Sequence, residues 1–238
     1  KIQETLTSGF RNAEIEGRGE LLFLLREKEK DFMKALDLAT GLYFEGLAED
    51  LSVTPGQTFA VRVTVVNRSS ENIELSHVDL EAEKGWELKL RERGSPLVEP
   101  GKKTVFEFSV SVPLDAQPSR GPGKRNSRKD AVYTVADSSL KSAPVPAPRL
   151  FVLLEYQLQG VRLSSKRPVQ CLDANPLRGA HKIQLVVVPS VTLEVSPPQQ
   201  LIPLETSAVR RDVQVKLVNN THSSSSGLLR ASPPAGWT

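Results

Sequence analysis

Residues 58–67 read Thr58-Phe59-Ala60-Val61-Arg62-Val63-Thr64-Val65-Val66-Asn67, and every second residue from Phe59 to Val65 is bulky and apolar. The same period of two returns further along the chain in Phe106, Phe108, Val110 and Val112. Successive side chains of a strand point to opposite faces, so both runs predict half-buried strands. We expect these residues to form two inward-facing rows of one sandwich.

Further short strands are predicted at residues 73–80, 86–91, 132–135, 150–158, 161–164 and 183–188. Between them lie turn signals, which are Pro55-Gly56, Asn67-Arg68-Ser69-Ser70, Lys84-Gly85 and Pro100-Gly101. Many short strands separated by such turns predict an all-β fold, an antiparallel β-sandwich.

One helix is predicted before the strands, over residues 20–40. Its apolar residues recur at intervals of three, four or seven on one face, at Leu21, Leu25, Phe32, Leu36 and Ala39. Gly41 stands where a C-terminal capping glycine is expected. The chain therefore opens with a short helical segment.

Two segments interrupt the rhythm of strands. Residues 115–130 combine Pro and Gly with five basic residues, Arg120, Lys124, Arg125, Arg128 and Lys129, and are predicted to form a mobile loop or insertion. Residues 142–148 contain three prolines and are predicted to be an extended connector.

The two ends of the chain repeat one pattern. Leu51-Ser52-Val53-Thr54-Pro55 matches Leu193-Glu194-Val195-Ser196-Pro197, and residues 61–67 match residues 213–219, each ending in Asn. A Gly-Trp pair follows in each copy, at Gly85-Trp86 and Gly236-Trp237. This order predicts two related sandwich domains, of which the second contains only its opening strands.

The charge is concentrated in one place. The formal net charge is +3, and the five basic residues of the 115–130 segment supply +5, so the rest of the chain sums to −2. Nucleic-acid binding needs many basic residues spread over one face, and we therefore expect no nucleic-acid partner. No stretch approaches the roughly 18 apolar residues of a membrane helix, so no membrane span is expected.

The single cysteine and the first residues of the chain limit which kinds of site and segment it contains. Cys171 alone excludes an internal disulfide and any site with several cysteine ligands. The chain begins with Lys1 and a polar run that has no features of a signal peptide. We interpret the chain as part of a larger polypeptide.

The segment from Val53-Thr54-Pro55-Gly56-Gln57 through the valine strand ending at Asn67 to Gly85-Trp86 resembles the bacterial Ig-like domain associated with α-galactosidases and other carbohydrate-active enzymes. This resemblance implies an Ig-like sandwich that accompanies a catalytic domain.

A second resemblance covers nearly the whole chain. The helix end at residues 35–42, the Pro-Gly-Gln sandwich, Arg167-Pro168-Val169-Gln170 and residues 185–189 are together similar to the C-terminal half of GlcNAc-phosphatidylinositol deacetylase-like (LmbE-like) bacterial proteins. The resemblance implies that a zinc-dependent catalytic domain precedes this segment. Its zinc motif, Pro-His-x-Asp-Asp, has no counterpart here, since His77 stands in Ser76-His77-Val78-Asp79.

Residues that could support catalysis or bind a metal are scattered. The three histidines, His77, His181 and His222, are 104 and 41 residues apart, and zinc needs three or four converging ligands. Cys171 follows a predicted strand, where a cysteine behaves as a small apolar side chain. We expect no catalytic residue, no metal site and no cofactor within this chain.

Possible ligand contacts are Trp86 and the basic residues Arg120, Lys124, Arg125, Arg128 and Lys129. Exposed tryptophans stack on sugars, but a Trp that occurs at equivalent places in two repeats is more simply a core residue. The basic loop has the charge to contact an anionic lipid or polysaccharide, and the simpler alternative is a solvated insertion.

These observations predict a helical segment at residues 1–48, an Ig-like sandwich at 49–190 and a truncated second sandwich at 191–238. The predicted function is that of a non-catalytic accessory module, periplasmic or secreted. Its predicted partner is the catalytic domain of the same polypeptide, and a glycan is a second candidate partner. The localisation follows from the resemblance. A carbohydrate-binding module and a structural adhesion or assembly domain are the alternatives.

Overall fold

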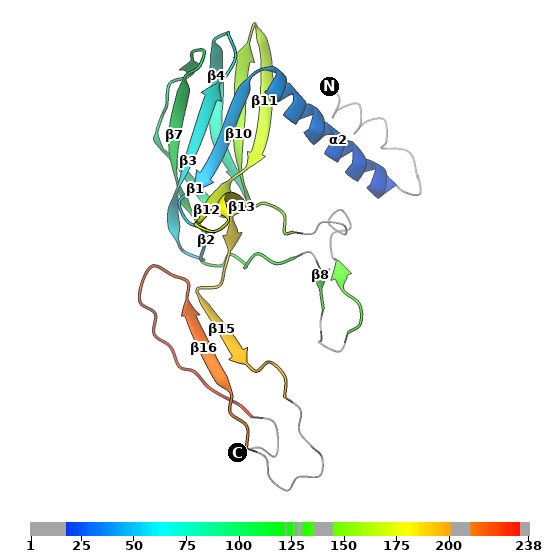
Figure 1. Ribbon diagram of the computed structural model, residues 1–238, viewed down its shortest axis with the longest axis vertical. Coiled ribbons are helices and arrows are strands. Elements are labelled where there is room, and N and C mark those ends of the chain that lie inside the picture. Colours follow the sequence, from blue (N-terminus) through cyan, green and yellow to red (C-terminus); the bar gives the residue numbers. More distant parts are fainter. Residues whose placement is uncertain are drawn as a thin grey trace.

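The computed structural model describes residues 18–121, 123–125, 127, 130–135, 145–200 and 210–233. A helix is followed by a two-layer β-sandwich, and a separate hairpin follows the sandwich (Figure 1). The predicted all-β class with Ig-like sandwich architecture is confirmed.

The larger sheet has six strands in the order β13-β12-β1-β3-β7-β5. Their bounds are β13 Gly179–Gln184, β12 Gln170–Asn175, β1 Leu42–Ala48, β3 Thr58–Asn67, β7 Lys103–Ser111 and β5 Glu87–Glu92. The facing sheet has the order β11-β10-β4-β6, formed by Val161–Pro168, Leu150–Leu158, Ile73–Ala82 and Leu97–Val98.

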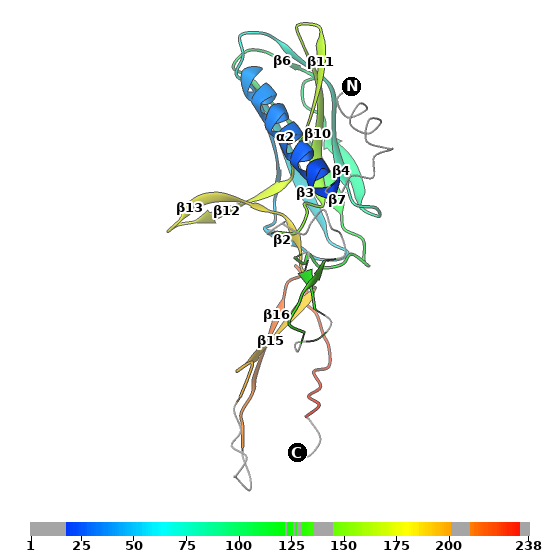
Figure 2. The ribbon, with the colours of Figure 1, turned by 90° about the vertical axis from the view of Figure 1, so that its right-hand side faces the viewer.

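Smaller pairs complete the described strands. Strand β2 (Ser52–Val53) pairs with β14 (Val186–Val187), β8 (Gly123–Lys124) with β9 (Thr134–Val135), and β15 (Val191–Ser196) with β16 (Gln214–Asn219). Two of the pairings, β1 with β12 and β2 with β14, are parallel, whereas the other described pairings are antiparallel. Figure 2 shows β12 and β13 extending sideways from the sandwich.

The predicted apolar rows form the core. Strands β3 and β7 pair so that Val61 lies opposite Phe108 and Val63 opposite Phe106. All eight predicted residues are buried, none more than 4% exposed: Phe59, Val61, Val63, Val65, Phe106, Phe108, Val110 and Val112. The opposing sheet contributes inward side chains of β4 and β10, including Ile73 and Tyr156. The period of two was therefore sufficient to assign the buried face.

The helix α2 (Arg18–Ala39) ends as predicted, but the domain boundary at residue 48 is wrong. Gly41 has a φ of +66°, and a Cβ there would lie 2.8 Å from the Ser69 backbone nitrogen, so only glycine fits this turn. The chain then enters β1, whose alternating burial and full pairing with β3 place it inside the sandwich. The sandwich thus begins at Leu42.

The predicted apolar stripe of α2 does not face the sandwich. Phe32 is 75% exposed and Ala39 is exposed, whereas Asp37, on another side of the helix, is 2% exposed. The helix therefore docks through a buried polar contact near its C-terminal end.

The repeat between the two ends of the chain is present, with one change of alignment. Strand β16 lies within residues 213–219 and corresponds to β3, which contains residues 61–67. Its partner β15 pairs with β16 in the way that β1 pairs with β3, so β15 corresponds to β1. The sequence pattern aligns residues 193–197 with residues 51–55, which include β2. The backbone pairing corrects this alignment: residues 193–195 correspond to part of β1 and not to β2. The sequence did not distinguish the two, because β1 and β2 are both short strands with apolar residues that precede β3.

The start of the predicted mobile loop at residues 115–130 is attached to the sandwich. Ser119 N donates to Val187 O (2.8 Å), Val187 N donates to the Ser119 hydroxyl (3.0 Å), and Ala116 packs against the core.

No helix within the described ranges has the length and apolar character that crossing a bilayer requires.

Candidate functional site

A groove of about 1510 Å³ lies between α2 and the outer face of the β4-β10-β11 sheet. It is lined by α2 from Glu29 to Leu38, by the turn into β1, by Arg68 and His77, and by residues of β10 and β11. Figure 2 shows α2 running alongside the strands of this sheet. This groove combines polar and apolar lining between two elements of the fold, and we treat it as the candidate site.

The floor of the groove is an ion pair that fixes the helix. Arg167 Nη2 donates to Asp37 Oδ2 at 2.7 Å, and the Ser165 hydroxyl donates to the same oxygen at 2.9 Å. Arg167 Nη1 donates to the carbonyl of Phe44 at 2.9 Å, and its guanidinium lies 4.5 Å from the Phe44 ring centre. Because Phe44 is on β1 and Arg167 on β11, one guanidinium links the helix to both sheets.

Two buried polar atoms lie in the same region. Asp37 Oδ1 and the Tyr156 hydroxyl have no hydrogen-bond partner among the described residues. Burial raises the pKa of Tyr156, and repulsion by the Asp37 charge raises it further. The phenol therefore stays protonated across the physiological range, as a potential donor next to an acceptor with free capacity.

Tyr43 forms the end of the groove nearest the start of β1 and is surrounded by cations. Arg68, Lys182 and Arg167 lie 4.9, 5.5 and 5.9 Å from its ring centre. The Tyr43 hydroxyl donates to Glu45 at 2.8 Å, and the Lys182 ammonium donates to that hydroxyl at 2.7 Å and pairs with Glu45. Hydrogen bonds to Glu45 and then to Tyr43 raise the pKa of Lys182, so this cation persists.

The outer sheet face adds one aromatic and alternating charges. The Lys166 ammonium lies 4.2 Å from the Phe151 ring centre and 2.9 Å from a Glu81 oxygen. His77 Nε2 is 3.5 Å from Asp79, with both side chains about half exposed. The groove thus offers cations, hydroxyls and aromatic faces for non-covalent contacts with a polar ligand.

The predicted ligand contacts lie elsewhere. Trp86, immediately before β5, is half-buried and meets Phe59 edge to face, with ring centres 6.4 Å apart. Arg120 and Lys124 are exposed, and the Arg125 guanidinium lies 4.8 Å from the Tyr133 ring centre. Arg128 and Lys129 fall outside the described residues. The groove lining contains none of Trp86, Arg120, Lys124 and Arg125.

The three histidines occupy separate places: His77 on β4, His181 on β13 and His222 after β16. Cys171 is fully buried, and burial raises the pKa of its thiol to about 11. Within the described ranges no group of three or more His, Cys, Asp or Glu side chains is arranged to hold a metal ion.

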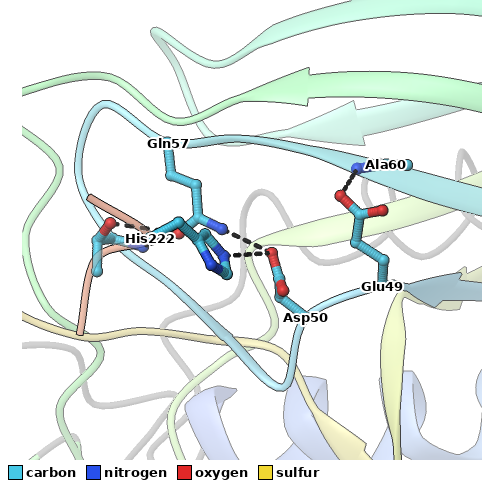
Figure 3. Close-up of polar contacts among 6 residues, drawn as sticks. Glu49, Asp50, Gln57, Ala60 and His222 are labelled. Carbon is cyan, nitrogen blue, oxygen red and sulfur yellow. Dashed lines mark hydrogen bonds and ion pairs between the residues drawn. The ribbon is translucent and has the colours of Figure 1, made fainter.

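Gln57 of the Pro-Gly-Gln motif has a structural role. Its Oε1 accepts from Thr54 N at 2.9 Å, and its Nε2 donates to Asp50 at 2.6 Å. Gly56 between them has a φ of +79°, as the third residue of a type II turn requires. Figure 3 shows Gln57 and His222 both directed at Asp50, with His222 Nε2 at 3.4 Å. The motif therefore braces a turn and contacts the segment after β16.

Sequence reasoning missed the groove. Asp37 and Arg167 are 130 residues apart. They stand in two segments, residues 35–42 and 167–170, that were singled out for their family resemblance, and nothing in either segment indicated that the two side chains pair. The available signal was an acidic residue between Leu36 and Leu38 in the last turns of the helix, where cations are favoured over anions.

Comparison with known proteins assigns part of the sandwich. Residues 53–124 match the family described as NPCBM-associated, NEW3 domain of alpha-galactosidase. The match extends from the end of β2 into β8 and contains β3 to β7. No curated protein matches the chain. The resemblance to an Ig-like domain associated with α-galactosidases is thereby confirmed, whereas no finding supports the deacetylase-like parent.

Two solved structures have limited similarity. The secreted serine protease VesC from Vibrio cholerae is 13% identical over 59% of this chain and 25% of its own, with a TM-score of 0.33. Spo0M, a sporulation control protein from Bacillus subtilis, is 16% identical over 57% of this chain and 51% of its own, with a TM-score of 0.32. The chain therefore spans a quarter to a half of these proteins. TM-scores this low do not show a shared fold, so neither protein indicates a function for this chain.

Proposed function

We propose that this chain is a non-catalytic accessory module of a larger, extracytoplasmic carbohydrate-active hydrolase. The observation that carries the proposal is the match of residues 53–124 to the NEW3 domain of α-galactosidase. That match supports an accessory domain attached to a catalytic domain of the same polypeptide. The module would position the enzyme or present its substrate, and the groove beside α2 supplies a surface for such contacts.

The finer proposal is that the catalytic partner is a GlcNAc-type N-deacetylase acting in the periplasm or outside the cell. Its support is the similarity of residues 35–42, 167–170 and 185–189 to deacetylase-like proteins. Metal-dependent deacetylation needs an ion with an open coordination position and a base beside it. In this proposal the catalytic domain of the parent supplies both.

The test uses the purified chain and the parent polypeptide side by side. The chain alone should bind no stoichiometric zinc, release no acetate from GlcNAc-containing substrates and hydrolyse no α-galactoside, while the parent acts on one of these substrates. Release of acetate by the parent supports the deacetylase, and hydrolysis of α-galactosides by the parent replaces it with a glycosidase. Tight zinc on the chain alone, lost in His77→Ala or His181→Ala, would overturn the accessory role.

A further inference from the structure

The groove beside α2 has an excess of positive charge. Five cationic side chains and three carboxylates contribute to its lining, so its formal charge is +2 with His77 neutral. The cations are Lys30, Lys34, Arg68, Lys166 and Arg167, and the carboxylates are Glu29, Asp37 and Glu155. A surface of this sign favours a ligand that carries negative charge.

Three of the five cations are held by carboxylates. The pairs are Lys30 with Glu27 at 2.5 Å, Lys166 with Glu81 at 2.9 Å and Arg167 with Asp37 at 2.7 Å. Arg68 and Lys34 also line the groove, and neither has a carboxylate partner in the part of the chain that the structure describes. These two cations are therefore available to a ligand.

The unpaired charge of Arg68 lies at the Tyr43 end of the groove. Its guanidinium carbon is 4.9 Å from the Tyr43 ring centre, and Arg167 and Lys182 are the other cations near this ring. The carboxylates that pair with these two cations are Asp37 and Glu45, respectively. Three cations against two carboxylates leave one positive charge, which is that of Arg68.

Arg68 is positioned before any ligand binds. Its backbone nitrogen donates to Gly41 O at 2.8 Å, and the side chain of Asn67, immediately before it, closes the turn by donating to Glu71 O at 2.7 Å. Its guanidinium lies over the Tyr43 ring, while its N–H groups have no acceptor among the described residues. A cation fixed in this way loses less conformational entropy on binding than a free surface side chain.

The available donor is suited to a carboxylate. A guanidinium presents parallel N–H groups that match the two oxygens of a carboxylate, and such charge-assisted pairs are stronger than hydrogen bonds between neutral groups. Tyr43 and Phe151 of the lining each have a cation over the ring, Arg68 and Lys166 respectively. Charge, and not stacking on a bare ring, is therefore the main means of recognition here.

The groove is large enough for more than one sugar unit. Its volume of about 1510 Å³ exceeds the roughly 300–1,000 Å³ of a small-molecule pocket. The hydroxyl of Ser164 and the carboxylate of Glu155 also line it, and both side chains are exposed. These groups can exchange hydrogen bonds with the hydroxyl groups of a carbohydrate.

We propose that the Tyr43 end of this groove binds the carboxylate of an acidic sugar, a uronate unit of an oligosaccharide, on the guanidinium of Arg68. Lys34 adds positive charge from α2, and neighbouring sugar units lie along the groove beside Ser164 and Glu155. The carboxylate site rests on the geometry of Arg68, whereas the identification of its ligand as a sugar rests on the proposed function.

The test is a titration of the ¹⁵N-labelled chain with trigalacturonate, followed by two-dimensional NMR. Saturable shifts are expected at Tyr43, Arg68 and Ser164. Arg68→Gln should weaken binding by about tenfold or more, because it removes a charge-assisted pair. Arg68→Lys should give an intermediate affinity, since the charge remains and the planar fork of donors is lost.

Arg162→Gln is the matched control. This arginine is exposed on β11, lies outside the groove lining and has no carboxylate partner among the described residues. Its replacement should leave binding unaltered although it removes the same charge. Arg68 is also exposed, so Arg68→Gln should leave the chain folded.

Two further measurements check the site independently of Arg68. Lys34→Gln, at the other cation without a partner, should weaken binding by a smaller factor than Arg68→Gln. Galactotriose, the neutral counterpart of the probe, should bind about tenfold or more weakly than trigalacturonate, because it lacks the carboxylates that the cations recognise.

Four outcomes would overturn the proposal. They are an absence of shifts up to the solubility limit of trigalacturonate, equal weakening by Arg68→Gln and Arg162→Gln, equal affinity for galactotriose, and equal affinity for inorganic phosphate, which would make this a site for any small anion. These results concern the chain alone. A parent polypeptide without hydrolase activity would remove the proposed function and leave the carboxylate site standing if trigalacturonate binds.

Discussion

At the scale of single residues, the contact that matters most is between Asp37 and Arg167, because it fixes a helix whose apolar stripe faces away from the sheets. The carboxylate is 2% exposed and the guanidinium side chain 28% exposed. Removing one partner of such a pair leaves a charge in a poorly solvated place, which costs more than the pair itself contributes.

Asp37→Ala is therefore expected to lower the free energy of unfolding by about 3 kcal/mol, the lower end of the range for breaking a buried pair. Urea unfolding monitored by circular dichroism measures this. Asp31→Ala is the matched control, since the Asp31–Lys28 pair on the same helix is exposed and should contribute under about 1 kcal/mol. Equal effects of the two changes would show that the ion pair does not anchor the helix.

Cys171 provides a prediction about pH. Its thiol pKa is raised from 9.0 to about 11 by burial, with a smaller contribution from the Asp50 charge. The folded state keeps the proton that the unfolded state loses above pH 9, so this stabilisation is complete below pH 9 and is lost as the pH rises to 11. Relative to Cys171→Ala, the native chain should lose about 3 kcal/mol of stability over that window.

Equilibrium unfolding at pH 8, 9, 10 and 11 for the two proteins measures the difference. Parallel curves would contradict a buried, protonated thiol. A thiol reagent at pH 8 gives an independent check, because Cys171 should react only after denaturant is added.

At the scale of elements, β3 and β7 hold the core through paired inward rows. Phe106→Ala should destabilise the chain by about 3–5 kcal/mol through lost burial and a cavity. Phe32→Ala on α2 is the matched control, because that side chain is 75% exposed and its truncation should change stability by less than about 0.5 kcal/mol. Thermal and urea unfolding of both variants measure this, and a loss under about 1 kcal/mol for Phe106→Ala would mean that the row is not core.

At the scale of the whole molecule, residues 188–190 join the sandwich to the hairpin, and residues 115–121 leave the sandwich at its lower end (Figure 1). Limited trypsin digestion should cut first within residues 115–130, where Arg120, Lys124 and Arg125 are exposed. Mass spectrometry of the first fragments identifies the site. First cuts within residues 58–91 would contradict the sandwich, since β3 and β4 occupy most of that range.

The sequence by itself determined the features that depend on neighbours along the chain. Alternating residues in β3 and β7 defined the buried face, because strand geometry alone sends them to one side. Gly41 marked the end of the helix, since its positive φ is a local requirement. The asparagine turns at Asn67 and Asn219 likewise close within five residues, so the order of residues along the chain is enough to reveal their repetition.

Only the tertiary structure decided which elements meet. The strand Leu42–Ala48 was missed because a segment rich in Leu and aromatic residues suits a helix or a strand, and its pairing with β3 selects the strand. The same pairing showed that β15 corresponds to β1. The helix docks through Asp37 because Arg167, 130 residues later, pairs with its buried charge. The apolar stripe of the helix does not reach the sandwich and does not contribute to docking. Contacts of that separation depend on topology, and no local pattern in a single sequence specifies them.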